Sequence, residues 1–183
     1  MSKLFDSQAL PLFVHALEFA SRKHSTQRRK DPAASPYINH PIVLVSILAI
    51  EAGIGDPDVL CAALLHDTIE DTETTREELE QHFGVTIARI VEEVTDDKDL
   101  EKQQRKRLQI EHAHALSPAA GLVKLADKIA NLRDVADCPP AHWDLERRQE
   151  YFDWAKAVVD GIPNVPPVLR KLFDTAYAQR PAA

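Results

Sequence analysis

The sequence contains only two cysteines, Cys61 and Cys138, and they do not form a CxxC pair. Cys61 lies in an apolar run, so we expect its thiol to be buried and reduced. No stretch is long and apolar enough to span a bilayer, and the first residues lack the apolar core of a signal peptide. These absences predict a cytoplasmic protein with reduced thiols.

Basic residues are fewer than acidic ones: 22 Lys and Arg stand against 29 Asp and Glu, for a net charge of -7. This balance argues against general binding to nucleic acid or to anionic membranes, and we expect neither partner. The net negative charge does not exclude a small anionic ligand, because a metal ion or a local basic cluster can make the electrostatic potential positive at one site. The length of 183 residues fits a single domain over residues 1–183. No feature of the sequence fixes the oligomeric state.

The alternating pattern of a half-buried strand is missing, whereas apolar residues recur at helical spacing almost throughout. Prolines, glycines and capping residues bound the predicted helices, and Gly84 is predicted to interrupt one of them. The predicted fold class is therefore all-α, a helical bundle. The predicted helices cover residues 9–20, 42–50, 57–67, 74–83, 85–94, 100–115, 117–135, 143–159 and 168–177.

One apolar helix is predicted to end in a dense polar cluster. The cluster consists of His66, Asp67, Glu70 and Asp71. If the helix continues through them, all four share one broad face, because each residue turns by about 100°. Three carboxylates this close repel one another unless a cation is present, and a divalent metal ion removes that cost. The alternative is a solvated helix end, which is the better interpretation of an isolated His-Asp pair.

Two further candidates lie on other predicted helices. His40 directly precedes a proline in the first turn of a helix, where the direction of its side chain is fixed. Asp127 shares a polar helix face with Lys124 and Asn131. Each has an ordinary alternative. His40 can be a polar helix start, and Asp127 can be an exposed partner of Lys124 or Arg133, which stabilises little.

The order His, His-Asp and Asp, each on its own helix, resembles the signature of the HD-domain metal phosphohydrolases. Longer matching strings lie at residues 29–31, 36–41, 63–72, 91–98 and 123–133. Together they resemble the hydrolase domain of the RelA/SpoT homologues over most of the chain. The resemblance is closest to the small, single-domain alarmone hydrolases, which include the metazoan SpoT homologues. It implies four metal ligands: His40, His66, Asp67 and Asp127.

The resemblance implies an HD-domain bundle with a metal site between helices, and it also implies an activity. The family removes the 3′-pyrophosphate of guanosine tetra- or pentaphosphate, (p)ppGpp, and leaves GDP or GTP. The chain has no room for the synthetase and regulatory domains of the long members, so we expect it to degrade the alarmone and lower a stringent-response signal. Mn²⁺ is the expected ion, with Fe²⁺ and Zn²⁺ as alternatives.

The resemblance also suggests roles for individual residues. It places Glu70 and Asp71 beside the metal-bound water and the scissile phosphate, where they share acid-base work in an undecided division. Arg29 is expected to stack on the base and Lys30 to contact phosphate, although a solvated basic loop is the alternative. The resemblance places Asn131 near the guanine, although it can instead pair locally on its helix. Tyr151 is expected to line the nucleotide site, although it can instead belong to the core. The matching nucleotide-site positions are Arg29, Lys30, Lys102, Asn131, Arg147 and Tyr151.

Three functions stay open at this point. The first is a (p)ppGpp 3′-pyrophosphohydrolase. The second is another nucleotide phosphohydrolase, most plausibly one that removes the 2′-phosphate of NADPH, as some small members of the family do. The third is an alarmone-binding sensor without turnover, against which the complete ligand set and the pair Glu70 and Asp71 argue.

Overall fold

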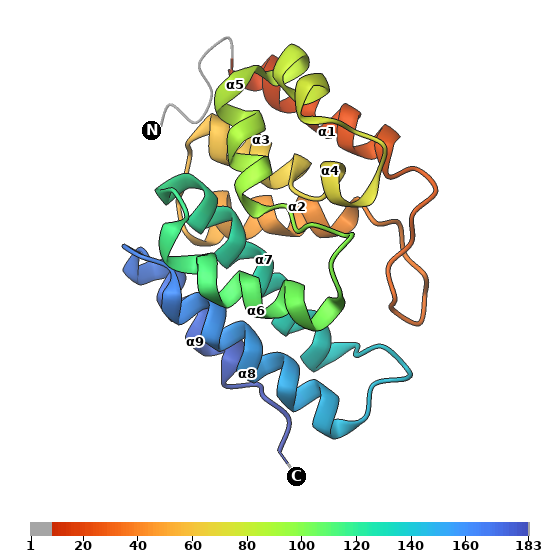
Figure 1. Cartoon of the computed structure of the whole chain (residues 1–183), viewed down its shortest axis with the longest axis vertical. Helices are drawn as coiled ribbons and strands as arrows, with labels where there is room; N and C mark the ends of the chain where they lie inside the picture. The colour runs from red at the N-terminus through yellow and green to blue at the C-terminus, as the bar shows by residue number, and fades with distance from the viewer. Residues whose placement is uncertain (1–8, 183) are drawn as a thin grey trace. The chain divides into compact units, whose positions relative to one another are not determined.

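The computed structural model describes residues 9–182, and every regular element in that range is a helix (Figure 1). The predicted all-α class is confirmed. None of the helices in the described range is long and apolar enough to cross a membrane. The elements are α1 (Ala9–Lys23), α2 (Asn39–Val45), the π-helix η1 (Ser46–Glu51), α3 (Pro57–Leu65), α4 (Thr68–Asp71), α5 (Arg76–Val94), α6 (Lys102–His112), the 3-10 helix η2 (Ala113–Ala115), α7 (Pro118–Asp137), α8 (Leu145–Gly161) and α9 (Pro167–Tyr177).

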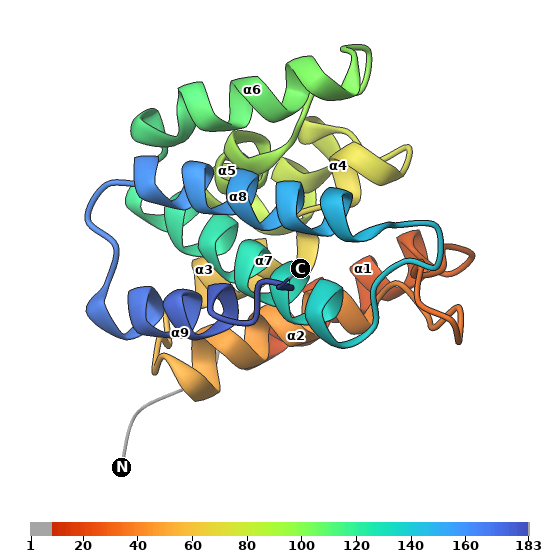
Figure 2. The same ribbon diagram turned by 90° about the horizontal axis from the view of Figure 1, so that it is seen from below.

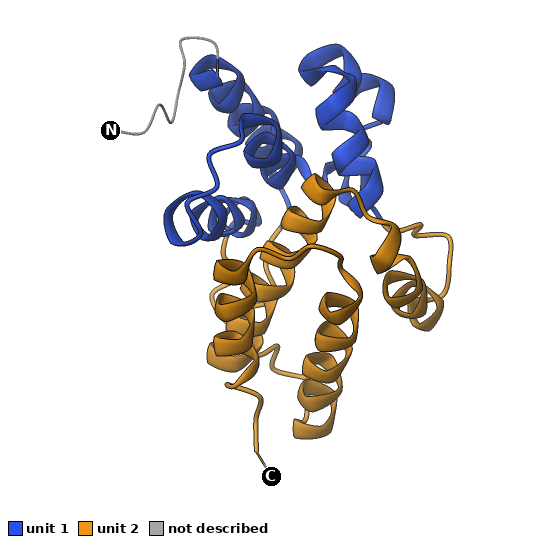
Figure 3. Cartoon of the chain, turned by 90° about the vertical axis from the view of Figure 1, so that its left-hand side faces the viewer, with its two compact units in different colours: residues 1–27, 36–95 blue, residues 28–35, 96–183 orange. Residues whose placement is uncertain are grey.

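The described chain forms two compact units (Figure 3). Unit 1 contains residues 9–27 and 36–95, and unit 2 contains residues 28–35 and 96–182. The short segment 28–35 therefore belongs to unit 2, although the residues on both sides of it belong to unit 1. The expectation of a single domain over residues 1–183 stays a prediction.

Helix α3 is the core of unit 1. Asp56 caps it, because its carboxylate accepts hydrogen bonds from the backbone N–H of Asp58 at 2.9 Å and of Val59 at 3.5 Å. Every residue from Val59 to Leu65 is buried, and α1, α2 and α5 all pack against this helix. A helix that is apolar on all sides is stable only when other helices surround it. The apolar run in the sequence thus places α3 at the centre of its unit.

Helix α5 contains the predicted interruption at Gly84. Thr75 caps the helix by accepting a hydrogen bond from the backbone N–H of Glu78 at 3.2 Å. At Gly84 the backbone adopts φ +83° and ψ 164°, a conformation essentially restricted to glycine. Helical geometry resumes at Val85. The glycine therefore changes the direction of the helix, and the prediction of a break is confirmed.

Helices α6 to α9 form the body of unit 2. Helix α7 begins with Ser117 and Pro118, and the Ser117 hydroxyl accepts a hydrogen bond from the backbone N–H of Ala120 at 3.3 Å. Helix α8 packs against α6 and α7, and α9 packs against α7 (Figure 2). The indole Nε1–H of Trp154 donates to the carbonyl of Lys106 at 3.0 Å, which ties α8 to α6. Trp154 is thus a packing residue between α6 and α8.

Replacing Gly84 by alanine should destabilise the protein, because a Cβ atom is strained at φ +83°. We expect the free energy of unfolding to fall by about 1–3 kcal/mol. Urea denaturation followed by circular dichroism measures it. Val85→Ala is the matched control, because Val85 is 62% exposed and should tolerate the change. Equal stability of the two variants would contradict the strain at Gly84.

The two cysteines should differ sharply in reactivity. Both are free; Cys61 is buried and Cys138 is exposed. Burial raises the pKa of the Cys61 thiol to about 12, which leaves almost no reactive thiolate at neutral pH. We expect an aromatic disulfide reagent to modify one thiol in the native protein and two after denaturation. The Cys138→Ser variant should not react while folded, and rapid modification of that variant would contradict the burial of Cys61.

Candidate metal centre and active site

Unit 1 brings three of the four predicted metal ligands together. The ligand atoms of His40, His66 and Asp67 all lie within 4.8 Å of one another. Nitrogen and oxygen ligands bind a divalent ion at about 2.0–2.2 Å, so two ligands of one ion lie up to about 4.4 Å apart. Both imidazoles are buried, and their ring centroids are 5.3 Å apart. The group is therefore close to the size that one shared ion requires.

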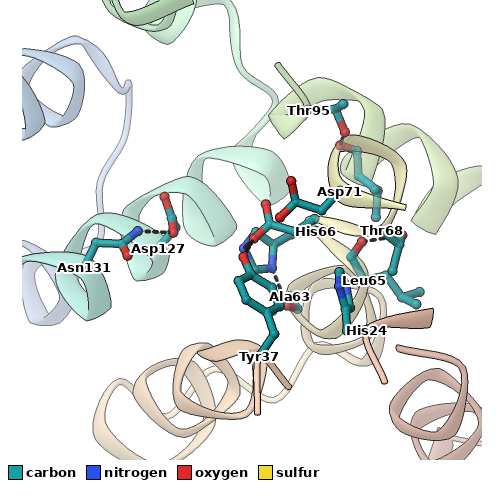
Figure 4. Close-up of polar contacts among 12 residues, drawn as sticks. His24, Tyr37, Ala63, Leu65, His66, Thr68, Asp71, Thr95, Asp127 and Asn131 are labelled. Atoms are coloured by element: carbon teal, nitrogen blue, oxygen red, sulfur yellow. Dashed lines mark hydrogen bonds and ion pairs between the residues drawn. The ribbon is translucent and has the colours of Figure 1, made fainter. Parts of the chain in front are cut away.

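The backbone near each histidine explains how it is held. The N–H of His40 donates to the carbonyl of Tyr37 at 2.9 Å, in the turn that begins α2. His66 follows α3 directly, and its Nδ1 lies 2.9 Å from the carbonyl oxygen of Ala63 (Figure 4). Because a carbonyl oxygen only accepts, Nδ1 of His66 carries the hydrogen. This bond fixes the ring so that Nε2 is the atom offered to a metal ion.

The contact between His66 and Asp67 also calls for a cation. Nε2 of His66 lies 2.9 Å from Oδ2 of Asp67. With the hydrogen on Nδ1, a neutral imidazole presents a lone pair to the carboxylate, and two electron-rich atoms at this distance repel. Either a proton or a metal ion between them removes the repulsion. A buried pair of this kind fits the nitrogen and oxygen donor set of a divalent metal site.

The helix does not continue through the polar cluster, so the condition for one shared helix face is not met. Helix α3 ends at Leu65, and α4 starts only at Thr68. Between them Asp67 adopts φ -101° and ψ 2°, and the Thr68 hydroxyl donates to the carbonyl of Leu65 at 2.7 Å (Figure 4). The threonine side chain thus takes a carbonyl that the continuing helix would have used. His66 and Asp67 meet through this turn and not through a shared helix face.

The hydroxyl of Tyr37 donates to Oδ2 of Asp67. Tyr37 lies three residues before His40. One short stretch of chain therefore supplies the predicted ligand His40 and also supports the predicted ligand Asp67. Partners of this kind orient metal ligands and raise metal affinity.

The predicted catalytic carboxylates lie on α4, in the same unit as this group. Glu70 and Asp71 are both half-buried. The side-chain amide of Gln27 donates to Oδ2 of Asp71 at 2.7 Å. The backbone N–H of Asp71 donates to the backbone carbonyl of Asp67 at 2.8 Å, which joins the main chains of the two residues. The roles of Glu70 and Asp71 in acid-base work stay predictions.

The fourth predicted ligand, Asp127, lies on α7 of unit 2. Its Oδ1 accepts a hydrogen bond from the amide of Asn131 at 2.5 Å (Figure 4), and its Oδ2 lies 3.1 Å from Nζ of Lys128. Asn131 therefore pairs locally on its helix, as one of the two interpretations expected. Lys128 is buried, and its Nζ lies 4.3 Å from the centre of the Trp154 ring. The metal-binding role of Asp127 stays a prediction.

Two of the predicted substrate-binding cations of unit 2 act electrostatically on a third, Lys102. Burial first, and then the charges of Arg147 and Lys30, lower the pKa of Lys102. Lys30 comes from the segment 28–35, Lys102 from α6 and Arg147 from α8. The Arg147 guanidinium lies 4.8 Å from the centre of the Trp143 ring. Such a cluster suits a polyanionic ligand.

The other predicted nucleotide contacts are held by neighbours. Arg29 forms an ion pair with Asp134, so its guanidinium is already bound by a carboxylate. The ring of Tyr151 lies between two tryptophans, 5.4 Å from Trp143 and 5.3 Å from Trp154 in centroid distance. Tyr151 thus takes part in aromatic packing. Its contact with a nucleotide, and that of Arg29, stay predictions.

Known proteins resemble this chain over nearly its whole length. The HD domain family model matches residues 16–153. A human relative named guanosine-3′,5′-bis(diphosphate) 3′-pyrophosphohydrolase MESH1 is 56% identical over 167 residues, which are 91% of this chain and 93% of the relative. The protein of the same name from Drosophila melanogaster is 51% identical over 168 residues, 92% of this chain and 94% of the relative.

A solved structure of a metazoan orthologue of SpoT that hydrolyses ppGpp is similar with a TM-score of 0.90. Its sequence is 49% identical, and the match covers 96% of this chain and 97% of that chain. This chain belongs to the HD-domain family, in the group of the MESH1 proteins. The HD-domain family implies a divalent metal ion, and the group of His40, His66 and Asp67 fits one.

Sequence reasoning missed several residues that support the HD-domain site. Tyr37 lies inside one of the strings that carry the family resemblance, three residues before His40, so its position was a usable signal. Lys128 likewise lies inside the string 123–133, whereas Gln27 lies in none of these strings. The contact of Gln27 with Asp71 spans 44 residues of sequence, and local periodicity carries no information about such contacts.

Removing the Tyr37 hydroxyl should weaken metal binding. In the Tyr37→Phe variant Asp67 loses a partner that orients it, and we expect the affinity for Mn²⁺ to fall about 10- to 100-fold. Isothermal titration calorimetry measures this. Tyr177→Phe is the matched control, because Tyr177 donates the same kind of bond to Asp153 at 3.0 Å, in unit 2. Equal Mn²⁺ affinities in the two variants would contradict the supporting role of Tyr37.

Proposed function

We propose that this protein is a metal-dependent guanosine 3′,5′-bis(diphosphate) 3′-pyrophosphohydrolase that converts (p)ppGpp to GDP or GTP and pyrophosphate. The observation that carries the proposal is the group of two buried histidines, His40 and His66, with half-buried Asp67, followed on α4 by Glu70 and Asp71. It occurs in a chain that is 56% identical to a relative bearing the name of this activity.

We propose Mn²⁺ as the ion. Two histidines and aspartate oxygens form a mixed donor set that suits Mn²⁺, with Fe²⁺ and Zn²⁺ as the alternatives. Asp127 is proposed as the fourth ligand on the strength of the family resemblance. Four protein ligands leave coordination positions for water and substrate. When bound, the ion supplies a Lewis acid and lowers the pKa of a coordinated water.

The reaction needs two proton transfers, and Glu70 and Asp71 are proposed to carry them. The oxygen of water forms a bond to the phosphorus nearest the ribose, and the bond between that phosphorus and the ribose 3′-oxygen breaks. One carboxylate takes a proton from the attacking water, and a proton returns to the departing 3′-oxygen. The two half-buried carboxylates are consecutive residues on α4, and the division of the steps between them is left open.

The substrate carries several phosphate charges, and cationic side chains of unit 2 are proposed to bind them. Lys30 and Arg147 are each close enough to Lys102 to lower its pKa, after the larger effect of burial. A bound polyphosphate would offset these effects on Lys102. Arg29, Asn131 and Tyr151 are proposed to contact the nucleoside, which requires Arg29 to exchange its partner Asp134 for the ligand.

We also propose that residues 1–183 act as one hydrolase domain, because the family model spans residues 16–153 and so includes parts of both units. A cytoplasmic location is proposed. The two free cysteines, one of them exposed, fit a reducing compartment. A nucleotide is the proposed partner, and neither nucleic acid nor a membrane is expected.

The decisive test is product analysis with purified protein and Mn²⁺. Either ppGpp or NADPH is supplied, and phosphorus NMR identifies the products. We expect GDP and pyrophosphate from ppGpp. We expect a loss of at least about 1000-fold in rate in the His66→Ala variant, because that variant lacks a metal ligand.

The outcomes separate the competing functions. Orthophosphate from NADPH, with ppGpp untouched, would keep the site and replace the substrate. No product from either nucleotide, with the bound metal demonstrated by elemental analysis, would overturn the hydrolase proposal. Saturable binding of ppGpp without turnover would then favour a sensor.

A further inference from the structure

A short chain of hydrogen bonds runs from a buried histidine to Asp71, entirely within unit 1. Nδ1 of His24 lies 2.6 Å from Oε1 of Gln27, and Nε2 of Gln27 donates to Oδ2 of Asp71 at 2.7 Å. His24 is 2% exposed and follows the end of α1. Figure 4 includes both ends of this chain, His24 and Asp71. None of these contacts involves a metal ligand directly.

The chemistry of the groups fixes the direction of every bond in the chain. An ionised carboxylate only accepts, so the NH₂ group of Gln27 must face Asp71. The amide oxygen of Gln27 then faces His24, so Nδ1 of His24 carries a hydrogen. Turning the amide around would place its oxygen against the carboxylate. His24 therefore holds the amide in the one orientation that supports Asp71.

The backbone on both sides of the amide is also fixed. The N–H of Gln27 donates to the carbonyl of His24 at 3.0 Å, and the carbonyl of Gln27 accepts from the N–H of Tyr37 at 3.2 Å. The ring of His24 lies 4.9 Å from the ring of Tyr37 in centroid distance. Tyr37 in turn donates to Asp67. Two residues joined through their backbones thus support Asp67 and Asp71 separately.

A glutamine suits this position for an electrostatic reason. A lysine or arginine at the same place would hold the carboxylate more strongly, but its positive charge would make Asp71 a poorer proton acceptor. A neutral amide orients the carboxylate with a smaller penalty of this kind. Burial lowers the pKa of His24, against the opposing effect of its bond to Gln27, so His24 also tends to add no charge.

We propose that Gln27 is a positioning residue for Asp71, and that His24 keeps the Gln27 amide in the required orientation. The inference rests on the proposed function, in which Asp71 moves a proton during hydrolysis. Gln27 acts through Asp71, to which its side-chain amide donates. Its loss should therefore affect the chemical step and leave binding intact.

The test is the Gln27→Met variant, which keeps the length of the side chain and removes the amide. We expect kcat for ppGpp hydrolysis to fall about 10- to 100-fold, the usual effect of a misplaced reacting group. KM for ppGpp and the Mn²⁺ affinity should stay within about twofold of the wild-type values, since other residues bind both ligands. A merely structural role would instead lower the amount of folded enzyme.

Gln109→Met is the matched control. Gln109 donates the same kind of bond, from its Nε2 to Oδ2 of Asp96 at 2.6 Å, but in unit 2. We expect the control to keep the wild-type kcat. The melting temperatures of both variants show whether each remains folded.

A second variant, Gln27→Glu, keeps the shape of the side chain even if the methionine is poorly tolerated. The new carboxyl group can donate to Asp71 only when it is protonated. We therefore expect its kcat relative to wild type to recover as the pH is lowered from alkaline to mildly acidic, whereas Gln27→Met shows no such recovery. This pH signature distinguishes a hydrogen bond from a packing effect.

The outcomes separate this inference from the proposed function. If the wild type hydrolyses ppGpp and Gln27→Met has the same kcat, the positioning role alone is overturned. A parallel rise in KM would also overturn it, because the residue would then act in binding. Absence of hydrolysis by the wild type, with Mn²⁺ bound, would overturn the proposed function itself.

Discussion

The site in unit 1 depends on the hydrogen bond between His66 and the carbonyl of Ala63. Helix α3 is buried on all sides, and the chain leaves it at His66, so a polar cluster begins where an apolar core ends. The bond to Ala63 places the hydrogen on Nδ1 and turns Nε2 toward Asp67. A buried neutral imidazole that faces a carboxylate calls for a proton or a metal ion between the two groups. The fold of unit 1 therefore fits a divalent cation at this position.

The segment between α1 and α2 supports this cluster from outside. His24 and Gln27 hold Asp71, and Tyr37 holds Asp67. Between Gln27 and Tyr37 lies the segment 28–35, which belongs to unit 2 and contains Arg29 and Lys30. Asp31 closes this excursion, because its carboxylate accepts hydrogen bonds from both the backbone N–H and the hydroxyl of Ser35. One stretch of sequence therefore contributes supporting residues to the proposed acid-base groups and also cations for the substrate.

The sequence was sufficient to predict the all-α fold and the grouping of His40, His66 and Asp67, because the family pattern and helical periodicity both mark them. The break between α3 and α4 was missed, because periodicity alone predicts that a helix continues. Thr68 was a local signal, since a threonine hydroxyl competes for helix carbonyls. The bonds of Tyr37 and Gln27 join positions 30 and 44 residues apart, and only tertiary packing determines them. The nucleotide contacts and the role of Asp127 stay predictions, because they concern ligands.

Each unit carries an electrostatic cost that one class of ligand relieves. In unit 1, carboxylates gather beside buried histidines, and a divalent cation removes their repulsion. In unit 2, burial and then the nearby charges of Arg147 and Lys30 lower the pKa of Lys102, and a bound polyphosphate would offset both effects. Stability is commonly lower at sites organised for function. The charges that weaken each unit favour binding of a ligand of opposite charge. A ligand that binds only the folded state in turn adds to the free energy of unfolding. The metal ion and the nucleotide should therefore each stabilise the fold, through different residues.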